Sequence, residues 1–254
     1  MKQLLTAGRT IFAIGMIALG VLCFIFKDFI VGRPPAWPGG LNVNPALGYV
    51  SGALIIVAAA AVLINKKAGE AALLIAVLIL ALSVCRHIPA FMNDWANAYK
   101  AMALFGGALI VSASFFNGQR SSAAERIANK DLVSGLVMTG SILLAAFFVV
   151  AGYAHFKYAD FVNTLIPSYI PFHSFFTYAC GICLFAGGAG LLIPAVKKWA
   201  ALLSGIMVAG WFLLLHIPRF IANPADRSDL LGLCESFSFA GIFFVLAAML
   251  SKKE

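Results

Sequence analysis

Two of the four histidines of this chain lie in the same pentapeptide, HIPxF, at residues 87–91 and 216–220. In each copy the histidine follows a long apolar run and precedes a proline. Histidine can act as an acid, a base or an axial haem ligand. Haem would need two such ligands facing each other, whereas His87 and His216 both stand beside a proline that is expected to end a helix. Haem is therefore disfavoured, and an interfacial polar cap is the alternative interpretation.

Glu235 lies inside an apolar segment near the end of the chain. An ionisable group within a membrane is costly to bury and marks a functional site by default. The alternative is a structural acid that is protonated or paired with Arg219 or Arg227. Further candidates for ligand binding or proton transfer are His155, His173, His216, Tyr153 and Asp160, for which interfacial hydrogen bonding is the alternative role.

The pair Cys180 and Cys183 forms a Cys-x-x-Cys motif, CGIC, inside another apolar segment. Such a pair can exchange electrons as a dithiol and a disulfide. Thiols within a membrane helix are more often packing residues, so a redox role is the less favoured interpretation. The remaining histidines and cysteines are not spaced as zinc ligands, and no metal site is predicted.

The segments that carry these residues are membrane helices by composition. The chain is 62% hydrophobic and 11% charged, whereas a soluble domain carries roughly 25% charged residues. About 20 helical residues span the hydrocarbon core, and backbone groups in lipid must be paired within each helix. An all-α, polytopic membrane protein with eight transmembrane helices is therefore predicted, at 9–26, 46–64, 69–87, 99–116, 133–154, 174–194, 198–217 and 230–250.

The basic residues lie mostly on one side of these helices. That side holds eleven of the 18 Lys and Arg residues against four of the ten acidic residues, an excess of seven positive charges. Basic loops stay in the cytoplasm and contact anionic membrane lipid. Both termini are therefore expected to be cytoplasmic, with the protein in the bacterial cytoplasmic (inner) membrane. The charge of +8 is explained in this way, so no nucleic-acid partner is predicted.

The chain also repeats itself. HIPAF aligns with HIPRF at an offset of 129 residues, and CFIFKDF (23–29) aligns with HFKYADF (155–161) at an offset of 132. An even number of helices in each half gives both halves the same orientation, so two parallel four-helix repeats are expected. The predicted units are residues 1–118, a cytoplasmic linker at 119–132, and residues 133–254.

The second half resembles the DoxX-like family of membrane proteins. The resemblance covers about residues 151–212 and rests on AGYAHFKYADF, the loop SYIPFH and the glycine-rich GGAGLLIPAVKKW. DoxX itself is the small membrane subunit of a thiosulfate–quinone oxidoreductase, so the resemblance implies a quinone as cofactor and a redox partner subunit. Family members often have Gly-x-x-Glu in the helix after the loop, where CGICLF places Cys183 or a neighbouring residue instead of the acid.

Two classes of function follow. The first is an accessory protein or subunit of membrane redox metabolism, with a quinone or lipid site at the outer end of the second repeat. The second is a non-enzymatic transporter, chaperone or assembly factor. The site is expected to bring His155, His216 and Glu235 into one cavity, with Arg219 at its rim. The matching cavity of the first repeat is expected to be apolar or filled, because Cys23 and Gly106 replace His155 and Glu235.

Overall fold

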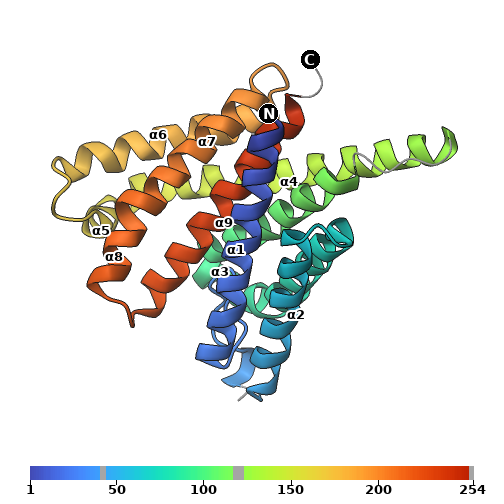
Figure 1. The fold of residues 1–254 in the computed structure, drawn as a ribbon. Helices are drawn as coiled ribbons and strands as arrows, with labels where there is room; N and C mark the ends of the chain where they lie inside the picture. Colours follow the sequence, from blue (N-terminus) through green and yellow to red (C-terminus); the bar gives the residue numbers. More distant parts are fainter. Residues whose placement is uncertain (41–43, 117–122, 252–254) are drawn as a thin grey trace.

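The computed structural model describes residues 1–40, 44–116 and 123–251, and no strand occurs in these ranges. Its longer helices are α1 (Lys2–Phe26), α2 (Ala46–Leu63), α3 (Ala68–Phe116), α4 (Ala123–Lys157), α6 (His173–Leu192), α7 (Lys197–Trp211) and α9 (Arg227–Leu250), as Figure 1 shows. The shorter ones are η1 (Pro38–Gly40), α5 (Ala159–Leu165), the π-helix η2 (Phe212–His216) and α8 (Ile217–Ala222). The predicted all-α class is confirmed.

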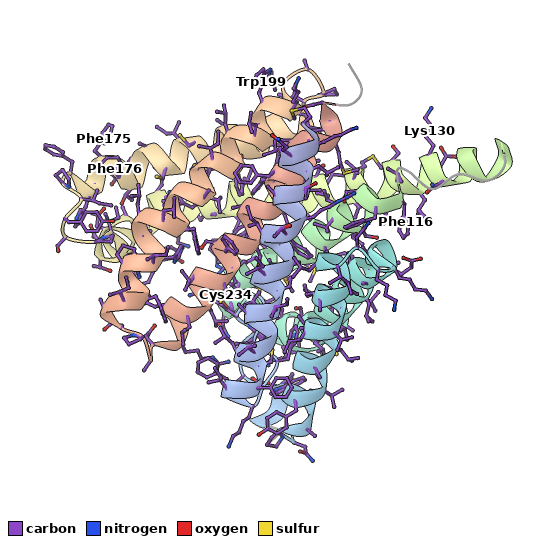
Figure 2. The ribbon with its side chains drawn as sticks, in the orientation of Figure 1. Phe116, Lys130, Phe175, Phe176, Trp199 and Cys234 are labelled. Carbon is purple, nitrogen blue, oxygen red and sulfur yellow. The ribbon has the colours of Figure 1, made fainter. Side chains whose placement is uncertain are left out.

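Within the described residues, seven helical segments are long and apolar enough to cross a membrane. They are α1, α2, α3, the 129–157 part of α4, α6, α9, and the run formed by α7, η2 and α8. Many large apolar side chains on these segments point outward, and Figure 2 shows Phe175 and Phe176 at one end of the molecule. Val57, Ile88 and Ile221 are 68–70% exposed, which water would penalise and lipid would not. The chain is an integral membrane protein.

The 49-residue helix α3 is not straight. A straight helix of this length would extend about 74 Å, more than twice the thickness of a hydrocarbon core. Backbone geometry is non-helical at Asp94 (φ −137°, ψ 38°). The hydroxyl of Ser112 donates to the carbonyl oxygen of Gly69 at 2.8 Å, so the two ends of α3 lie side by side. Helix α3 is a hairpin whose two arms contain the predicted third and fourth spans.

The expectation that the HIPxF prolines end their helices is wrong. Pro89 lies inside α3, and Pro218 lies in the first turn of α8, which continues to Ala222. The helical path is lost five residues after each proline, at Asp94 and at Asn223 (φ −136°, ψ 68°). A proline interrupts one hydrogen bond on its N-terminal side and leaves the following turn free to form.

Helices α1 and α2 meet at two glycines and two rings. A Cβ on Gly20 would lie 2.9 Å from the carbonyl oxygen of Gly52, and a Cβ on Gly52 would lie 2.9 Å from the ring of Phe24. The rings of Phe24 and Tyr49 are 5.5 Å apart. Small residues at this contact let the two backbones approach closely, as is common between membrane helices.

The same contact occurs between α4 and α6. A Cβ on Gly152 would lie 3.1 Å from the carbonyl oxygen of Gly181, and a Cβ on Gly181 would lie 2.8 Å from the ring of Phe156. The rings of Phe156 and Tyr178 are again 5.5 Å apart. The α4 residues follow their α1 counterparts by 132 positions, and the α6 residues follow their α2 counterparts by 129.

Helices α1 and α9 run side by side through the centre of the molecule (Figure 1), although they come from opposite ends of the chain. A Cβ on Gly241 of α9 would lie 2.5 Å from the backbone nitrogen of Phe12 and 2.6 Å from the carbonyl oxygen of Gly8. Backbone atoms cannot yield as a flexible side chain can. This contact therefore requires glycine at position 241.

We expect Gly241→Ala to destabilise the protein by about 1–3 kcal/mol, because the added methyl group must push α1 away from α9. The measurement is the thermal unfolding midpoint of the protein in detergent. Gly210→Ala is the matched control, since nothing lies within 4 Å of a Cβ at that position of α7. Equal midpoints for the two variants would contradict the close packing of α1 on α9.

Candidate functional site

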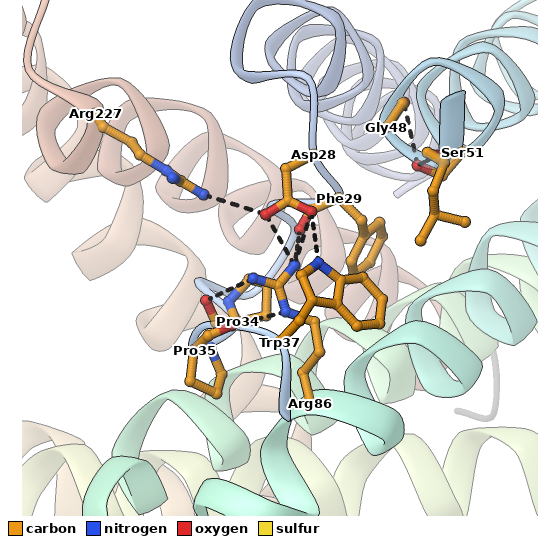
Figure 3. Close-up of polar contacts among 10 residues, drawn as sticks. Asp28, Phe29, Pro34, Pro35, Trp37, Gly48, Ser51, Arg86 and Arg227 are labelled. Carbon is orange, nitrogen blue, oxygen red and sulfur yellow. Dashed lines mark hydrogen bonds and ion pairs between the residues drawn. The ribbon is translucent and has the colours of Figure 1, made fainter. Parts of the chain in front are cut away.

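The loop between α1 and η1 is held by a single buried arginine. Nη1 of Arg86 lies 3.0 Å from each carboxylate oxygen of Asp28 and donates to the carbonyl oxygen of Phe29 at 2.7 Å, while Nε donates to that of Pro35 at 2.7 Å. Trp37 donates from Nε1 to Asp28 at 3.1 Å, and the guanidinium of Arg86 lies 4.6 Å from the centre of the Trp37 ring. Figure 3 shows this network. We call residues 27–40 and 44–45 the 27–45 loop, and the end of the bundle that carries them the loop end.

The loop then turns back toward α9 at Gly32, whose φ is +80°. A Cβ at this position would also lie 2.6 Å from Cβ of Ala101. Its backbone N–H donates to Oε1 of Glu235 at 3.1 Å. Glycine is needed here for the left-handed backbone and for the close approach to α3, and both place the N–H against the carboxylate.

Glu235 is buried, and its partners come from the first half of the chain. Its Oε2 lies 3.4 Å from Nε of Arg33 and 3.4 Å from Nζ of Lys100. The side chain of Glu235 is 4% exposed. We call Arg33, Lys100 and Glu235 the ion cluster. It contains two cations and one carboxylate, and it joins the 27–45 loop, α3 and α9.

This arrangement corrects the expected partners of Glu235. Arg219, expected beside Glu235, instead donates from Nε to Oδ1 of Asp229 at 2.7 Å and from Nη1 to the carbonyl oxygen of Leu165 at 3.2 Å. Asp229 is itself buried, at 4% exposure. Arg219 therefore connects α8 to α9 and to the end of α5.

A cavity of about 630 Å³ opens between the 27–45 loop, α3 and the start of α9. Its lining includes Asp28, Arg33, Trp37, Arg86, Asn97 and Arg227. Its volume falls in the range of small-molecule sites. This cavity is not the one expected around Cys23 and Gly106, because its lining comes from both halves of the chain. Cys23 is fully buried, and a Cβ on Gly106 would lie 3.0 Å from Leu143, so that part of the first half is filled as expected.

The two HIPxF histidines differ in their surroundings. His216 ends the π-helix, and a Cβ on Gly232 would lie 2.7 Å from its Nδ1 and 3.1 Å from Nη2 of Arg33. The side chains of His216 and Arg33 therefore lie close together, both against the backbone at Gly232. His87 lies in the regular part of α3, 3% exposed, with Nδ1 3.9 Å from Asp94. Among the described residues, neither ring nitrogen of His87 nor Nδ1 of His216 has a hydrogen-bond partner.

The π-helix has a local cause. Pro218 carries no N–H, so the carbonyl of Leu214 four residues earlier loses its helical donor. The hydroxyl of Tyr169, from the loop before α6, donates to that carbonyl. Single π turns of this kind often occur at functional sites.

The other predicted site residues lie near α4 and α6. Nδ1 of His155 is 2.8 Å from the carbonyl oxygen of Ala151, and its ring stacks 6.3 Å from that of Trp211. Tyr153 is exposed beside Trp95, with the ring centres 6.0 Å apart. Asp160 is exposed in α5, and His173 is the half-buried first residue of α6. Among the other candidates, His216 approaches the ion cluster, because its ring and Arg33 both border Gly232.

Cys180 and Cys183 are both free thiols on α6, the first half-buried and the second exposed. In the ranges that the structure describes, no group of three or more His, Cys, Asp or Glu residues could hold a metal ion. The redox role of the pair stays a prediction.

Sequence reasoning missed Asp28, Gly32, Arg33, Arg86 and Lys100 as site residues. One signal was present, since Asp28 is shared by the two aligned segments CFIFKDF and HFKYADF. The partners of Glu235 could not be found in this way, because Gly32 precedes it by 203 residues.

We expect Glu235→Gln to lower the stability by about 3 kcal/mol, because it leaves Arg33 and Lys100 facing each other without a buried counter-charge. Lys100→Met should change the stability by less than about 1 kcal/mol, since Arg33 and Glu235 remain paired. Thermal midpoints in detergent give the comparison, with exposed Glu70→Gln as the control. Equal losses for Glu235→Gln and Lys100→Met would show that charge balance does not govern the ion cluster.

A family described as a domain of unknown function (DUF8561) matches residues 144–219. The matched segment runs from the middle of α4 to α8 and contains His155, Cys180, Cys183, His216 and Arg219. The chain is therefore similar to that family over less than a third of the chain's length. No curated protein matches the chain, and no solved structure matches it.

Proposed function

We infer that this protein is a DoxX-like membrane protein that binds a quinone or a lipid at the loop end, as an accessory protein or subunit of membrane redox metabolism. The observation that carries the proposal is the charged cavity beside the ion cluster. Ionisable side chains inside a membrane protein are expensive to bury and are kept where they serve a ligand or a proton. The cavity combines such side chains with Trp37 and Leu231, as an amphiphile requires.

The site differs from the one expected at the outer end of the second repeat, because both halves contribute to it. Asp28, Arg33 and Trp37 come from the first half, and Arg227 comes from the second. Guanidinium groups can donate to a quinone carbonyl or to a lipid phosphate. A redox partner subunit would then pass electrons to a quinone held at this end, which would be reduced to the quinol.

The ion cluster also favours the alternative of a transporter. His216 is a titratable group with an unpartnered Nδ1 among the described residues, and it meets Arg33 over Gly232. Interrupted helices and buried ionisable groups are the usual elements of ion-coupled transport. The π-helix η2 is such an interruption.

The proposed topology has eight crossings in two parallel four-helix repeats. The hairpin of α3 supplies two crossings from one segment. The glycine and aromatic contacts that recur at offsets of 132 and 129 residues support a duplication. The start of α1 and the end of α9 lie at the same end of the molecule in Figure 1, as an even number of crossings requires. The basic excess favours the cytoplasm of a bacterium for that end.

Reporter fusions test this topology. A reporter fused after Asp94 should lie outside the cytoplasm, because α3 is expected to cross the membrane twice. Reporters fused after Lys66 and after Glu254 should lie inside. An alkaline phosphatase and a green fluorescent protein at each position give opposite readouts. A cytoplasmic fusion at Asp94 would reduce the count to six and overturn the repeat.

Purification in mild detergent, followed by solvent extraction and mass spectrometry, tests the bound amphiphile. We expect about one quinone or lipid molecule per protein, and a several-fold loss in Ala36→Trp, which places an indole in the cavity. Ala225→Trp is the control, since this exposed residue lies in the turn before α9. Equal amounts of quinone and lipid in Ala36→Trp and Ala225→Trp would refute the proposed site.

A further inference from the structure

The cavity at the loop end carries an excess of positive charge. Asp28 is neutralised by Arg86, and the ion cluster holds two cations against one carboxylate. Arg227 adds a further positive charge at the cavity wall. A cavity with this balance has an electrostatic preference for an anion.

The donors of Arg86 are largely used within the protein. Its Nε and Nη1 bind Asp28 and the carbonyl oxygens of Phe29 and Pro35, and its Nη2 lies 3.5 Å from the carbonyl oxygen of Pro34. It shapes the loop and contributes little to a ligand. Binding must come from the other two arginines of the lining.

Arg33 and Arg227 retain donors that face the cavity. Arg33 uses Nε for Glu235 and Nη2 for the carbonyl oxygen of Ser228, at 2.7 Å, and its side chain is 29% exposed. Nη2 of Arg227 is 3.9 Å from Asp28, beyond hydrogen-bond distance, and the side chain is 47% exposed. The guanidinium of Arg227 is oriented by the ring of Phe26, 5.1 Å away.

We propose that Arg33 and Arg227 bind a phosphate group in this cavity, as the headgroup of an anionic lipid or as free phosphate. The planar guanidinium matches two phosphate oxygens at once, which a neutral carbonyl ligand would not exploit. Arg227 and Ser228 open α9, so the positive end of this helix adds to the attraction. Trp37 and Leu231 lie along the remaining wall, where an acyl chain or glycerol group would pack.

This inference rests on the proposed function and selects the phosphate-bearing ligand from the two classes it allows. The test is native mass spectrometry of the full chain, delipidated in detergent and titrated with phosphatidylglycerol or with phosphatidylcholine. Wild-type protein should bind one phosphatidylglycerol molecule in preference to phosphatidylcholine.

Arg227→Gln should weaken phosphatidylglycerol binding about tenfold, the effect of losing one charge-assisted contact. Arg33→Lys, which keeps the charge, should weaken it less. Lys157→Gln is the control, since it removes an exposed positive charge outside the cavity lining. Retained binding in Arg227→Gln, or equal binding of the two lipids, would overturn the inference.

Inorganic phosphate distinguishes the two sources of the anion. Displacement of phosphatidylglycerol by millimolar phosphate, with sodium chloride of equal ionic strength as the control, would identify free phosphate as a competent ligand. Phosphatidylglycerol that resists phosphate would identify the lipid. If the purified protein instead carries a quinone that Ala36→Trp removes, and Arg227→Gln has no effect, the proposed function holds and the phosphate inference fails.

Discussion

The buried carboxylate of Glu235 joins the parts of this molecule that the chain itself keeps far apart. It receives a backbone N–H from Gly32, faces the guanidinium of Arg33 and lies beside the ammonium of Lys100. In a membrane each of these groups would be costly to bury alone. Because the carboxylate and its donors offset one another's cost of burial, their contacts hold the 27–45 loop, α3 and α9 together. The cavity at the loop end exists because this loop is fixed there rather than extended into water.

The membrane class and the positions of the helices could be predicted from the sequence because lipid leaves few alternatives. Long apolar runs must be helical, and the eight predicted runs correspond to seven long segments, of which α3 contains two. A break between the spans at 69–87 and 99–116 was predicted, but its position at Asp94 was not. A proline was expected to stop the helix, whereas the chain turns five residues later in both halves. Such a turn depends on the contacts of the arms, which local sequence does not reveal.

The candidate site was predicted less well, and the reason is physical. Glu235 was identified because an acid in an apolar run is costly wherever it points. Its partners are chosen by packing between elements that are far apart in the chain: Gly32 and Arg33 precede it by 203 and 202 residues. Nearness in sequence suggested Arg219, which satisfies Asp229 instead. Repetition was also misleading, since it implied that the more polar second half holds the site.

The two halves also differ in how their last two long helical arms are joined. In the first half α3 continues through Asp94 without a loop, and Ser112 binds Gly69 across the hairpin. In the second half the chain leaves the helix between Ala222 and Arg227 and reaches α8 through a π turn. We expect the two arms of α3 to tilt together as one rigid unit. We expect α8 and α9 to change their angle at the non-helical segment between Ala222 and Arg227. A ligand that binds both Arg33 and Arg227 would therefore link the more rigid first half of the protein to the more flexible second half.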